Sequence, residues 1–265
     1  MNLFIRLTGD VPTLQKCFFR NFFALAIAAA SLIRSKTPLR IGQGNLKYLI
    51  ARSVAGIIGM FGNFYAVDHL PISDASMLNK LSPFCAIFFS GLLLKEQANH
   101  VEWLSVLAAF IGAMFVAKPT FGMEMIPAAA GIMGGICAGL AYTNVRALGK
   151  RGENSMIVVA FFSGFTTLVL SVPLLLRYLH MSPRQWLFLI LTGTAAAGGQ
   201  IFITKAYAKA AAKEISVYDF SIVIFAAIFG FLFLGQLPDG WSIIGYLIII
   251  GTAVMKWRYS MKHQA

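Results

Sequence analysis

The chain has 265 residues, of which 58% are apolar and only 12% are charged, and its mean hydropathy is +0.74. A soluble domain carries about 25% charged residues, so this composition excludes an ordinary cytosolic enzyme, a secreted disulfide module and a disordered tail. The formal net charge of +12 comes from 22 Lys and Arg against 10 Asp and Glu. In a membrane protein such an excess indicates basic cytoplasmic loops rather than a nucleic-acid partner.

Nine apolar runs follow one another along the chain, each close to the roughly 20 residues that a transmembrane helix needs. Short breaks with Pro, Gly and charged residues separate them. The sequence therefore predicts an all-α integral membrane protein with about nine spans and no attached soluble domain. The runs lie near 14–33, 46–66, 73–94, 100–117, 125–145, 155–177, 183–206, 215–234 and 240–256.

An internal repeat relates the two halves of the chain at an offset of about 140 residues. Residues 92–116 align with 231–255. Their identity is low, but the two segments have the same length and the same order of helix-breaking residues and apolar runs. On this offset, the run 125–145 corresponds to a helix that would reach residues 1–7 from upstream of Met1. We therefore expect ten helices arranged as five plus five. Residues 1–119 would form the first repeat, lacking most of its first helix, and residues 120–265 the second.

Because five is an odd number, the two repeats must enter the membrane in opposite directions, and the Lys and Arg residues of alternate breaks support this. One side receives 14 of them and the other receives 4. By the positive-inside rule the richer side is cytoplasmic, which places the C-terminus inside. Inverted repeats of this kind are typical of transporters. The richer side holds Arg34, Lys36, Arg40, Lys47, Lys95, Arg146, Lys150, Arg151, Lys205, Lys209, Lys213, Lys256, Arg258 and Lys262; the poorer holds Lys16, Lys118, Arg177 and Arg184.

Three segments carry a resemblance to a known family: "FFRN" (18–21), "LNKLSPFCAIFFSGLLLKE" (78–96) and "YDFSIVIFAAIFGFLFLGQLPD" (218–239). They resemble the EamA-type branch of the drug/metabolite transporter superfamily, over essentially the whole chain. The resemblance implies a ten-helix secondary transporter of the inner membrane that moves amino acids, related metabolites or small organic compounds. The family commonly has Glu where this chain has Gln236, whereas Glu96 keeps the acid in the first half.

Two charged residues inside the predicted spans are candidates for a function at membrane depth. Lys80 is about seven residues into the run 73–94, and Asp219 is about five into 215–234. A charge at mid-membrane costs about 2.5–3.5 kcal/mol on insertion scales, so such groups are functional hypotheses by default. The inverted repeat would place Lys80 in the outer half and Asp219 in the inner half of one cavity, which suits a zwitterion. The alternatives are that Lys80 reaches the outer interface and that Asp219 satisfies a neighbouring backbone group or Tyr218.

Other polar side chains complete the predicted substrate-binding set. Asn63 and Gln200 occupy near-equivalent places in the two repeats, and their amides can both donate and accept. Asn79, beside Lys80, aligns with Asp219. Pro83 removes the hydrogen bond that the Asn79 carbonyl would accept, which predicts a kink beside Lys80. The predicted substrate-binding residues are Lys80, Asp219, Asn63, Asn79, Gln200 and Tyr218.

Several features have structural interpretations instead. Three arginines near predicted span ends are expected to reach the lipid headgroups along their own stems. Two glycine stripes are expected to let helices pack closely, Asn99 with Glu102 has the spacing of a helix capping box, and His69 beside Asp68 is a candidate pH sensor. The arginines are Arg20, Arg52 and Arg146, and the stripes are Gly56, Gly59 and Gly62, and Gly131, Gly135 and Gly139.

The sequence has no Walker-type loop, no H-E-x-x-H motif and no Cys/His cluster, so it predicts a protein that is not an enzyme and has no cofactor or metal. We predict a secondary transporter that alternates access in the cytoplasmic membrane, with a small-molecule substrate and the lipid bilayer as its partners and no nucleic acid. The rival hypotheses are a polytopic membrane enzyme or lipid-handling protein, and an inactive truncated transporter. Substrate identity, direction of transport, coupling ion and the choice between monomer and homodimer stay open.

Overall fold

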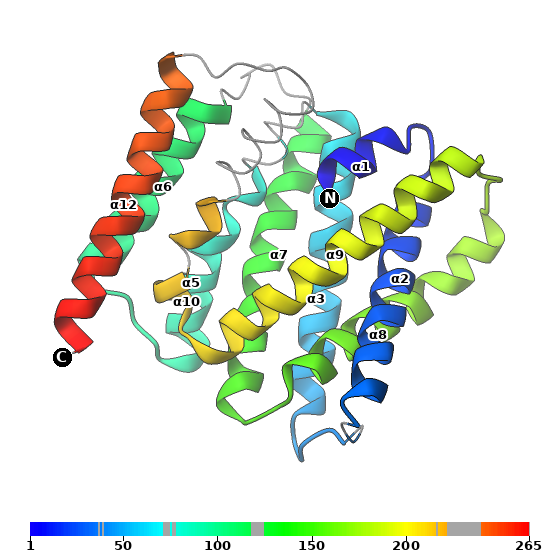
Figure 1. The fold of residues 1–265 in the computed structure, drawn as a ribbon, viewed down its shortest axis with the longest axis horizontal. Helices are drawn as coiled ribbons and strands as arrows, with labels where there is room; N and C mark the ends of the chain where they lie inside the picture. Colours follow the sequence, from blue (N-terminus) through cyan, green and yellow to red (C-terminus); the bar gives the residue numbers. More distant parts are fainter. Residues whose placement is uncertain are drawn as a thin grey trace.

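The computed structural model describes residues 1–36, 38, 40–70, 75, 78–117, 125–215, 217–221 and 240–264, and every regular element in these ranges is a helix (Figure 1). This confirms the predicted all-α class. The helices are α1 (Asn2–Leu7), α2 (Thr13–Arg34), α3 (Leu46–His69), α5 (Ser82–Leu94), α6 (His100–Ala117), α7 (Met125–Lys150), α8 (Ser155–Leu176), α9 (Pro183–Lys209), α10 (Ala212–Ile215), the short 3-10 helix η1 (Tyr218–Phe220) and α12 (Gly240–Gln264).

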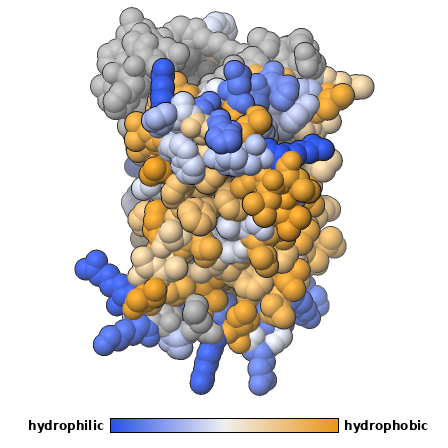
Figure 2. All heavy atoms as spheres, turned by 90° about the vertical axis from the view of Figure 1, so that its right-hand side faces the viewer, coloured by the Kyte–Doolittle hydropathy of each residue, from blue (hydrophilic) through white to orange (hydrophobic). Residues whose placement is uncertain are grey.

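Five of the described helices, α2, α3, α7, α8 and α9, are long and apolar enough to cross a membrane, and two shorter apolar helices lie within α5 and α6. Figure 2 shows apolar side chains gathered in a band around the middle of one face, with the most hydrophilic side chains at its two ends. The chain is thus a multi-pass membrane protein. Residues 73, 74, 76 and 77 of the predicted run 73–94 and most of the run 215–234 lie outside the described residues, as do Lys118 and Gln236.

Side-chain caps fix where several helices begin, because the first backbone N–H groups of a helix have no partner within it. The predicted capping box at α6 is confirmed: Glu102 N donates to Asn99 Oδ1 (2.9 Å) and Asn99 N donates to Glu102 Oε2 (2.8 Å). A second capping box, between Ser182 and Gln185, begins α9, and Asn154 Oδ1 accepts from Met156 N at the start of α8.

Glycines let α3 and α7 cross with their backbones in contact, as the stripes predicted. A Cβ at Gly59 would lie 3.1 Å from the Ala138 nitrogen, and one at Gly134 would lie 3.0 Å from the Asn63 nitrogen. The glycines expected on α7 face a different neighbour, since a Cβ at Gly135 would lie 2.8 Å from the Leu78 carbonyl oxygen. Helix α7 therefore has two glycine faces, one against α3 and one against residues 78–86.

Two of the three helix pairs that the internal repeat makes equivalent pack against one another. On the predicted offset α2 corresponds to α8, α3 to α9 and α6 to α12. Helix α2 packs along α8 and α6 along α12, while both reciprocal pairs, α2 with α9 and α3 with α8, are also in contact. Figure 1 shows α6 and α12 side by side and running in opposite directions, with the C-terminus at the lower end. Reciprocal contacts are what a two-fold relation produces, so this packing is the one expected of an inverted repeat.

Candidate functional site

Lys80 lies at a break between helices. Lys80 and Leu81 form a turn, α5 begins at Ser82, and Pro83 lies in its first turn, where a missing N–H costs no helical hydrogen bond. The predicted kink is therefore a complete break. Lys80 Nζ donates to the backbone carbonyl of Asp219 (2.8 Å) and lies 5.9 Å from the centre of the Phe220 ring.

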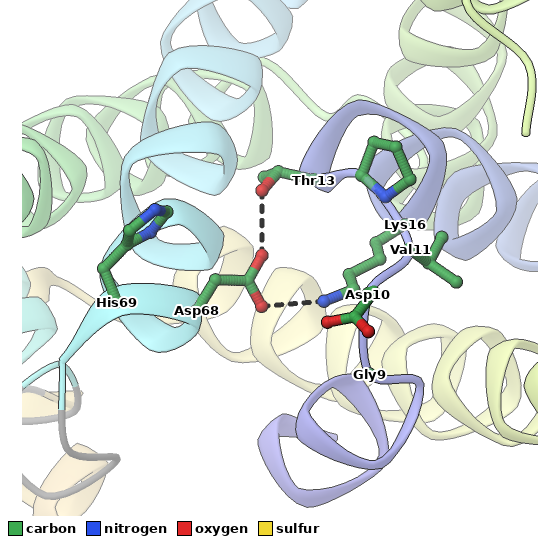
Figure 3. Close-up of a pocket in the computed structure, with 8 residues that line it drawn as sticks. Gly9, Asp10, Val11, Thr13, Lys16, Asp68 and His69 are labelled. Atoms are coloured by element: carbon green, nitrogen blue, oxygen red, sulfur yellow. Dashed lines mark hydrogen bonds and ion pairs between the residues drawn. The ribbon is translucent and has the colours of Figure 1, made fainter.

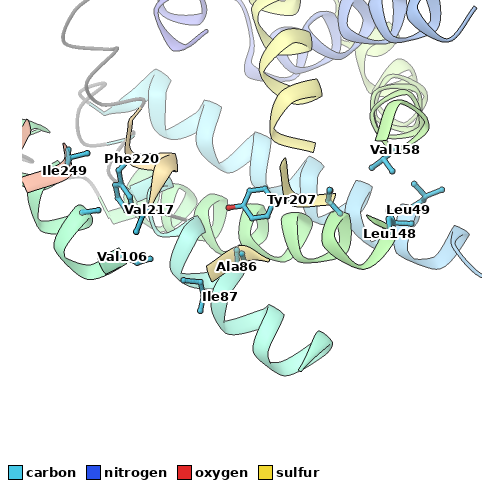
Figure 4. Packing of buried hydrophobic residues seen from close by; sticks show 14 residues of the cluster. Leu49, Ala86, Ile87, Val106, Leu148, Val158, Tyr207, Val217, Phe220 and Ile249 are labelled. Carbon is cyan, nitrogen blue, oxygen red and sulfur yellow. The ribbon is translucent and has the colours of Figure 1, made fainter. Parts of the chain in front are cut away.

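Asp219 lies in η1 and is hydrogen-bonded to the buried Tyr207, whose ring stacks on the half-buried Tyr142. Its Oδ2 accepts from the hydroxyl of Tyr207 (2.8 Å), and the Tyr207 ring stacks on Tyr142 of α7 with centroids 4.6 Å apart. Figure 4 shows Tyr207 among the buried apolar residues, with its hydroxyl on the side where Val217 and Phe220 lie. The structure brings Lys80 and Asp219 together, as the repeat alignment suggested, but as direct neighbours rather than in opposite halves of a cavity.

The other predicted residues occupy varied environments. Asn63 is buried on α3, and its Oδ1 has no hydrogen-bond partner among the described residues. Gln200 Nε2 donates to Thr204 Oγ1 (3.1 Å) on the same helix. Asn79 is half-buried, and Tyr218 is 43% exposed. It is thus Tyr207 that contacts the Asp219 carboxylate; sequence reasoning missed it because a tyrosine near a span end is typical of an interfacial anchor.

The expectation that Arg20 and Arg52 reach lipid headgroups is wrong. Arg20 is 8% exposed and Arg52 is 2% exposed. The guanidinium carbon of Arg52 lies 3.5 Å from the centre of the Phe162 ring on α8, and that of Arg20 lies 5.9 Å from the same point. A Cβ at Gly56 would lie 2.7 Å from both Arg52 Nη1 and Phe162 Cε2, so the glycine leaves room for this stacking.

The polar side chains of this interior lie on helices that contact one another. Helix α3, which carries Arg52, packs against α2, which carries Arg20, and against α7, whose Tyr142 stacks on Tyr207 of α9. The interior therefore has a polar line that begins on α2 and α3, passes through α7 and α9 and ends at Asp219 and Lys80. Polar groups inside a membrane bundle are costly unless they serve a substrate path or a partner. This line of polar side chains is therefore a candidate path for a polar solute.

Arg146, also expected at the headgroups, instead forms an ion pair with Glu96 (Nη2 to Oε1, 2.9 Å). Lys150 lies 3.3 Å from the same oxygen, and Ser90 Oγ donates to Oε2. Burial alone would raise the pKa of the Glu96 carboxyl, but these hydrogen bonds and the Arg146 charge together hold it below its ordinary value. The pair joins α7 to the segment after α5.

Glu102 makes a second set of ion pairs. Its Oε1 lies 3.0 Å from Lys256 Nζ on α12, and its Oε2 lies 3.6 Å from Lys213 Nζ on α10. In both clusters the carboxylate comes from the residues predicted as the first repeat and the cations from those predicted as the second. The two halves are thereby held together at the end of the bundle where the C-terminus lies (Figure 1).

A pocket of about 470 Å³ opens where α2 begins and α3 ends (Figure 3). Asp68 accepts from Lys16 Nζ (2.7 Å) and Thr13 Oγ1 (2.8 Å), and His69 Nδ1 lies 2.9 Å from the Tyr65 carbonyl oxygen. His69 thus contacts Tyr65 rather than its neighbour Asp68. Within the described ranges, no three His, Cys, Asp or Glu side chains are grouped so as to hold a metal ion.

Comparison with known proteins agrees with this architecture. The EamA-like transporter family matches residues 3–118 and 125–257, and the chain belongs to that family. It is similar to the pseudopaline exporter CntI of Pseudomonas aeruginosa strain PAO1, at 28% identity over 93% of this chain and 87% of that protein. It is also similar to human solute carrier family 35 member G1, at 27% identity over 98% of this chain and 77% of that protein. A solved crystal structure of another protein superposes with a TM-score of 0.80 at 16% identity, over 96% of this chain and 90% of that one.

Proposed function

We propose that this protein is a secondary transporter that moves a small organic solute across the cytoplasmic membrane by alternating access, with its C-terminus in the cytoplasm. The observation that carries the proposal is the contact between Lys80 and Asp219 inside the bundle. Each residue comes from a different predicted repeat, at positions that the repeat alignment places next to each other. Membership of the EamA-like transporter family, with an exporter and a solute carrier among the relatives, supports it.

Lys80 is the proposed group that engages the substrate. Its ammonium donates to a neutral backbone carbonyl. A substrate carboxylate would add the attraction of a full negative charge to this hydrogen bond, so exchange of the carbonyl for the carboxylate is favourable. Asp219, oriented by the Tyr207 hydroxyl, would then receive an amino or hydroxyl group of the solute. Asn63, Asn79, Gln200 and Tyr218 remain proposed lining groups.

Alternating access in this proposal is the rocking of the two halves about the polar line. The ion pairs of Glu96 and Glu102 hold the halves together at the end that the charge distribution assigns to the cytoplasm. Their opening would expose the interior to that side. The break beside Lys80 allows residues 78–81 to move independently of α5, as broken helices do at transporter sites.

Uptake into proteoliposomes made with the full chain tests the proposal. The solutes are a panel of ¹⁴C-labelled amino acids and small carboxylates. At least one should accumulate above protein-free liposomes, and Lys80→Ala should reduce its rate by tenfold or more. Lys205→Ala, which removes an exposed lysine from α9, should transport like the unmodified protein. If no labelled solute moves, the transporter proposal fails; if Lys80→Ala transports normally, the assignment of Lys80 fails.

A further inference from the structure

Four cationic side chains are buried among the described residues, and two of them lack an acid. Lys16 is paired with Asp68 at 2.7 Å and Lys256 with Glu102 at 3.0 Å. Arg20 and Arg52 form no ion pair with any residue that the structure describes, although both are more than nine-tenths buried. The excess positive charge inside the bundle is therefore located on this arginine pair.

Part of the hydrogen-bonding capacity of the pair is also unused. Arg20 Nε and Arg52 Nε and Nη1 are buried without a hydrogen-bond partner among the described residues. The hydroxyls of Ser53 and Ser163, which adjoin Arg52 and Phe162 in the sequence, are in the same condition. Native proteins pair nearly all buried donors, and an arginine cannot lose its proton to relieve the cost. Such a group needs a partner that the described part of the protein does not supply.

The geometry of the pair suits a planar or tetrahedral oxyanion. The guanidinium of Arg52 stacks on the Phe162 ring, and the missing side chain of Gly56 lets both groups pack against the α3 backbone, which holds the guanidinium in place. A fixed guanidinium fork binds carboxylate or phosphate oxygens through two parallel hydrogen bonds. Arg20, whose Nη1 donates to Asn21 Oδ1 (3.0 Å), presents a second cation to the same ring.

We infer that Arg20 and Arg52 bind the oxyanion group, carboxylate or phosphate, of the transported solute, so that the substrate class is an organic anion. This inference rests on the proposed function and specifies its substrate. Arg20, Arg52 and Lys80 together carry two more charges than Asp219 neutralises, and a dianion balances them whereas a zwitterion does not. We assign the remaining groups of the solute to the Lys80 side of the polar line, where Tyr142 stacks on Tyr207 and the Tyr207 hydroxyl donates to Asp219.

Thermal unfolding of the full chain in detergent tests the inference with two probes, 10 mM succinate and 10 mM inorganic phosphate, against chloride at equal ionic strength. A ligand that binds only the folded state raises the unfolding temperature by mass action. At least one probe should raise it; succinate alone identifies a carboxylate site and phosphate alone a phosphate site. Arg20→Gln and Arg52→Gln should abolish the shift, and Lys205→Gln should keep it. No shift with either probe, or an equal shift in Arg52→Gln, overturns the inference.

Stability without any anion separates a binding role from a structural one. If Arg52 serves the ligand, its charge is unpaired in the empty protein, and Arg52→Gln should unfold at the same temperature as the unmodified chain or higher. If Arg52 serves the fold, the variant should unfold at a lower temperature in chloride buffer, which would overturn the inference.

Transport of labelled succinate, phosphate and leucine distinguishes failure of this inference from failure of the proposed function. Transport of succinate or phosphate that is lost in Arg52→Gln supports both. Transport of leucine that is unaffected by Arg52→Gln leaves the transporter standing and overturns the anion site. Stabilisation by an anion through Arg52 without transport of any solute supports the anion site and rejects the transporter.

Discussion

Glu96 and its partners show how a single carboxylate can connect the two halves of the molecule. Its side chain is 13% exposed and lies 2.9 Å from Arg146 and 3.3 Å from Lys150. Removal of one member of a mostly buried pair leaves the other charges uncompensated, at a cost of about 1–3 kcal/mol for a site that keeps some contact with water. Glu96→Gln should therefore lower the unfolding temperature in detergent at pH 7, whereas Glu214→Gln on α10 should not.

The same pair has a defined pH dependence. The folded pKa of Glu96 is below its ordinary value of 4.5, so its contribution to stability is fully present above about pH 4.5 and is lost as the pH falls through the folded pKa. A series of unfolding temperatures from pH 7 to pH 3 should show a smaller acid-induced decrease in Glu96→Gln than in the unmodified protein. An identical decrease in both proteins would show that Glu96 gains nothing from its partners.

Residue roles were only partly predictable from the sequence. The repeat alignment predicted that Lys80 and Asp219 share one interior region, but it placed them in opposite halves of a cavity, whereas they are in direct contact. The burial of Arg20 and Arg52 did not follow, because distance from a span end does not tell which face of the helix an arginine occupies. Partnership with Phe162, about 110 residues beyond Arg52 along the chain, depends on tertiary packing that no local pattern encodes.

At the scale of elements, the close crossing of α3 and α7 is a direct test of the packing. A Cβ at Gly62 would collide with the carbonyl oxygen of Ala130, a backbone atom that cannot rotate away. Gly62→Ala should thus destabilise the protein by about 1–3 kcal/mol, the usual range for overpacking. Gly198→Ala on α9, where nothing lies within 4 Å of the added Cβ, should be neutral or slightly stabilising because alanine favours helix. Equal unfolding temperatures for the two variants would contradict the crossing.

Helix starts were the most predictable feature, because the apolar runs and the capping residues both act locally, whereas the last helix continues eight residues beyond its predicted end at 256. The predicted starts at 46, 100, 125, 155 and 183 coincide with those of α3, α6, α7, α8 and α9. The region around Lys80 was less predictable. A proline four residues after Asn79 can kink a continuous helix or begin a new one, and the local sequence does not distinguish the two outcomes.

At the scale of the whole molecule, the antiparallel relation of equivalent helices and the polar line between them form the basis of the transport proposal. Both depend on contacts between residues more than 100 positions apart, such as Lys80 with Asp219 and Glu102 with Lys256. The repeat and the charge asymmetry allowed the arrangement to be predicted. The apolar pattern alone would equally have fitted a bundle packed throughout with aliphatic side chains.

The most direct test of alternating access is the labelling of one interior position from each side of the membrane. The chain has three cysteines, so a variant with Cys17, Cys85 and Cys137 replaced by alanine provides the background. Ser163→Cys then places a thiol at a fully buried position on α8. A membrane-impermeant maleimide should label it in both right-side-out and inside-out vesicles, more slowly when a transported solute is present. Labelling from one side only, or from neither, would contradict a carrier that opens its polar interior to both sides.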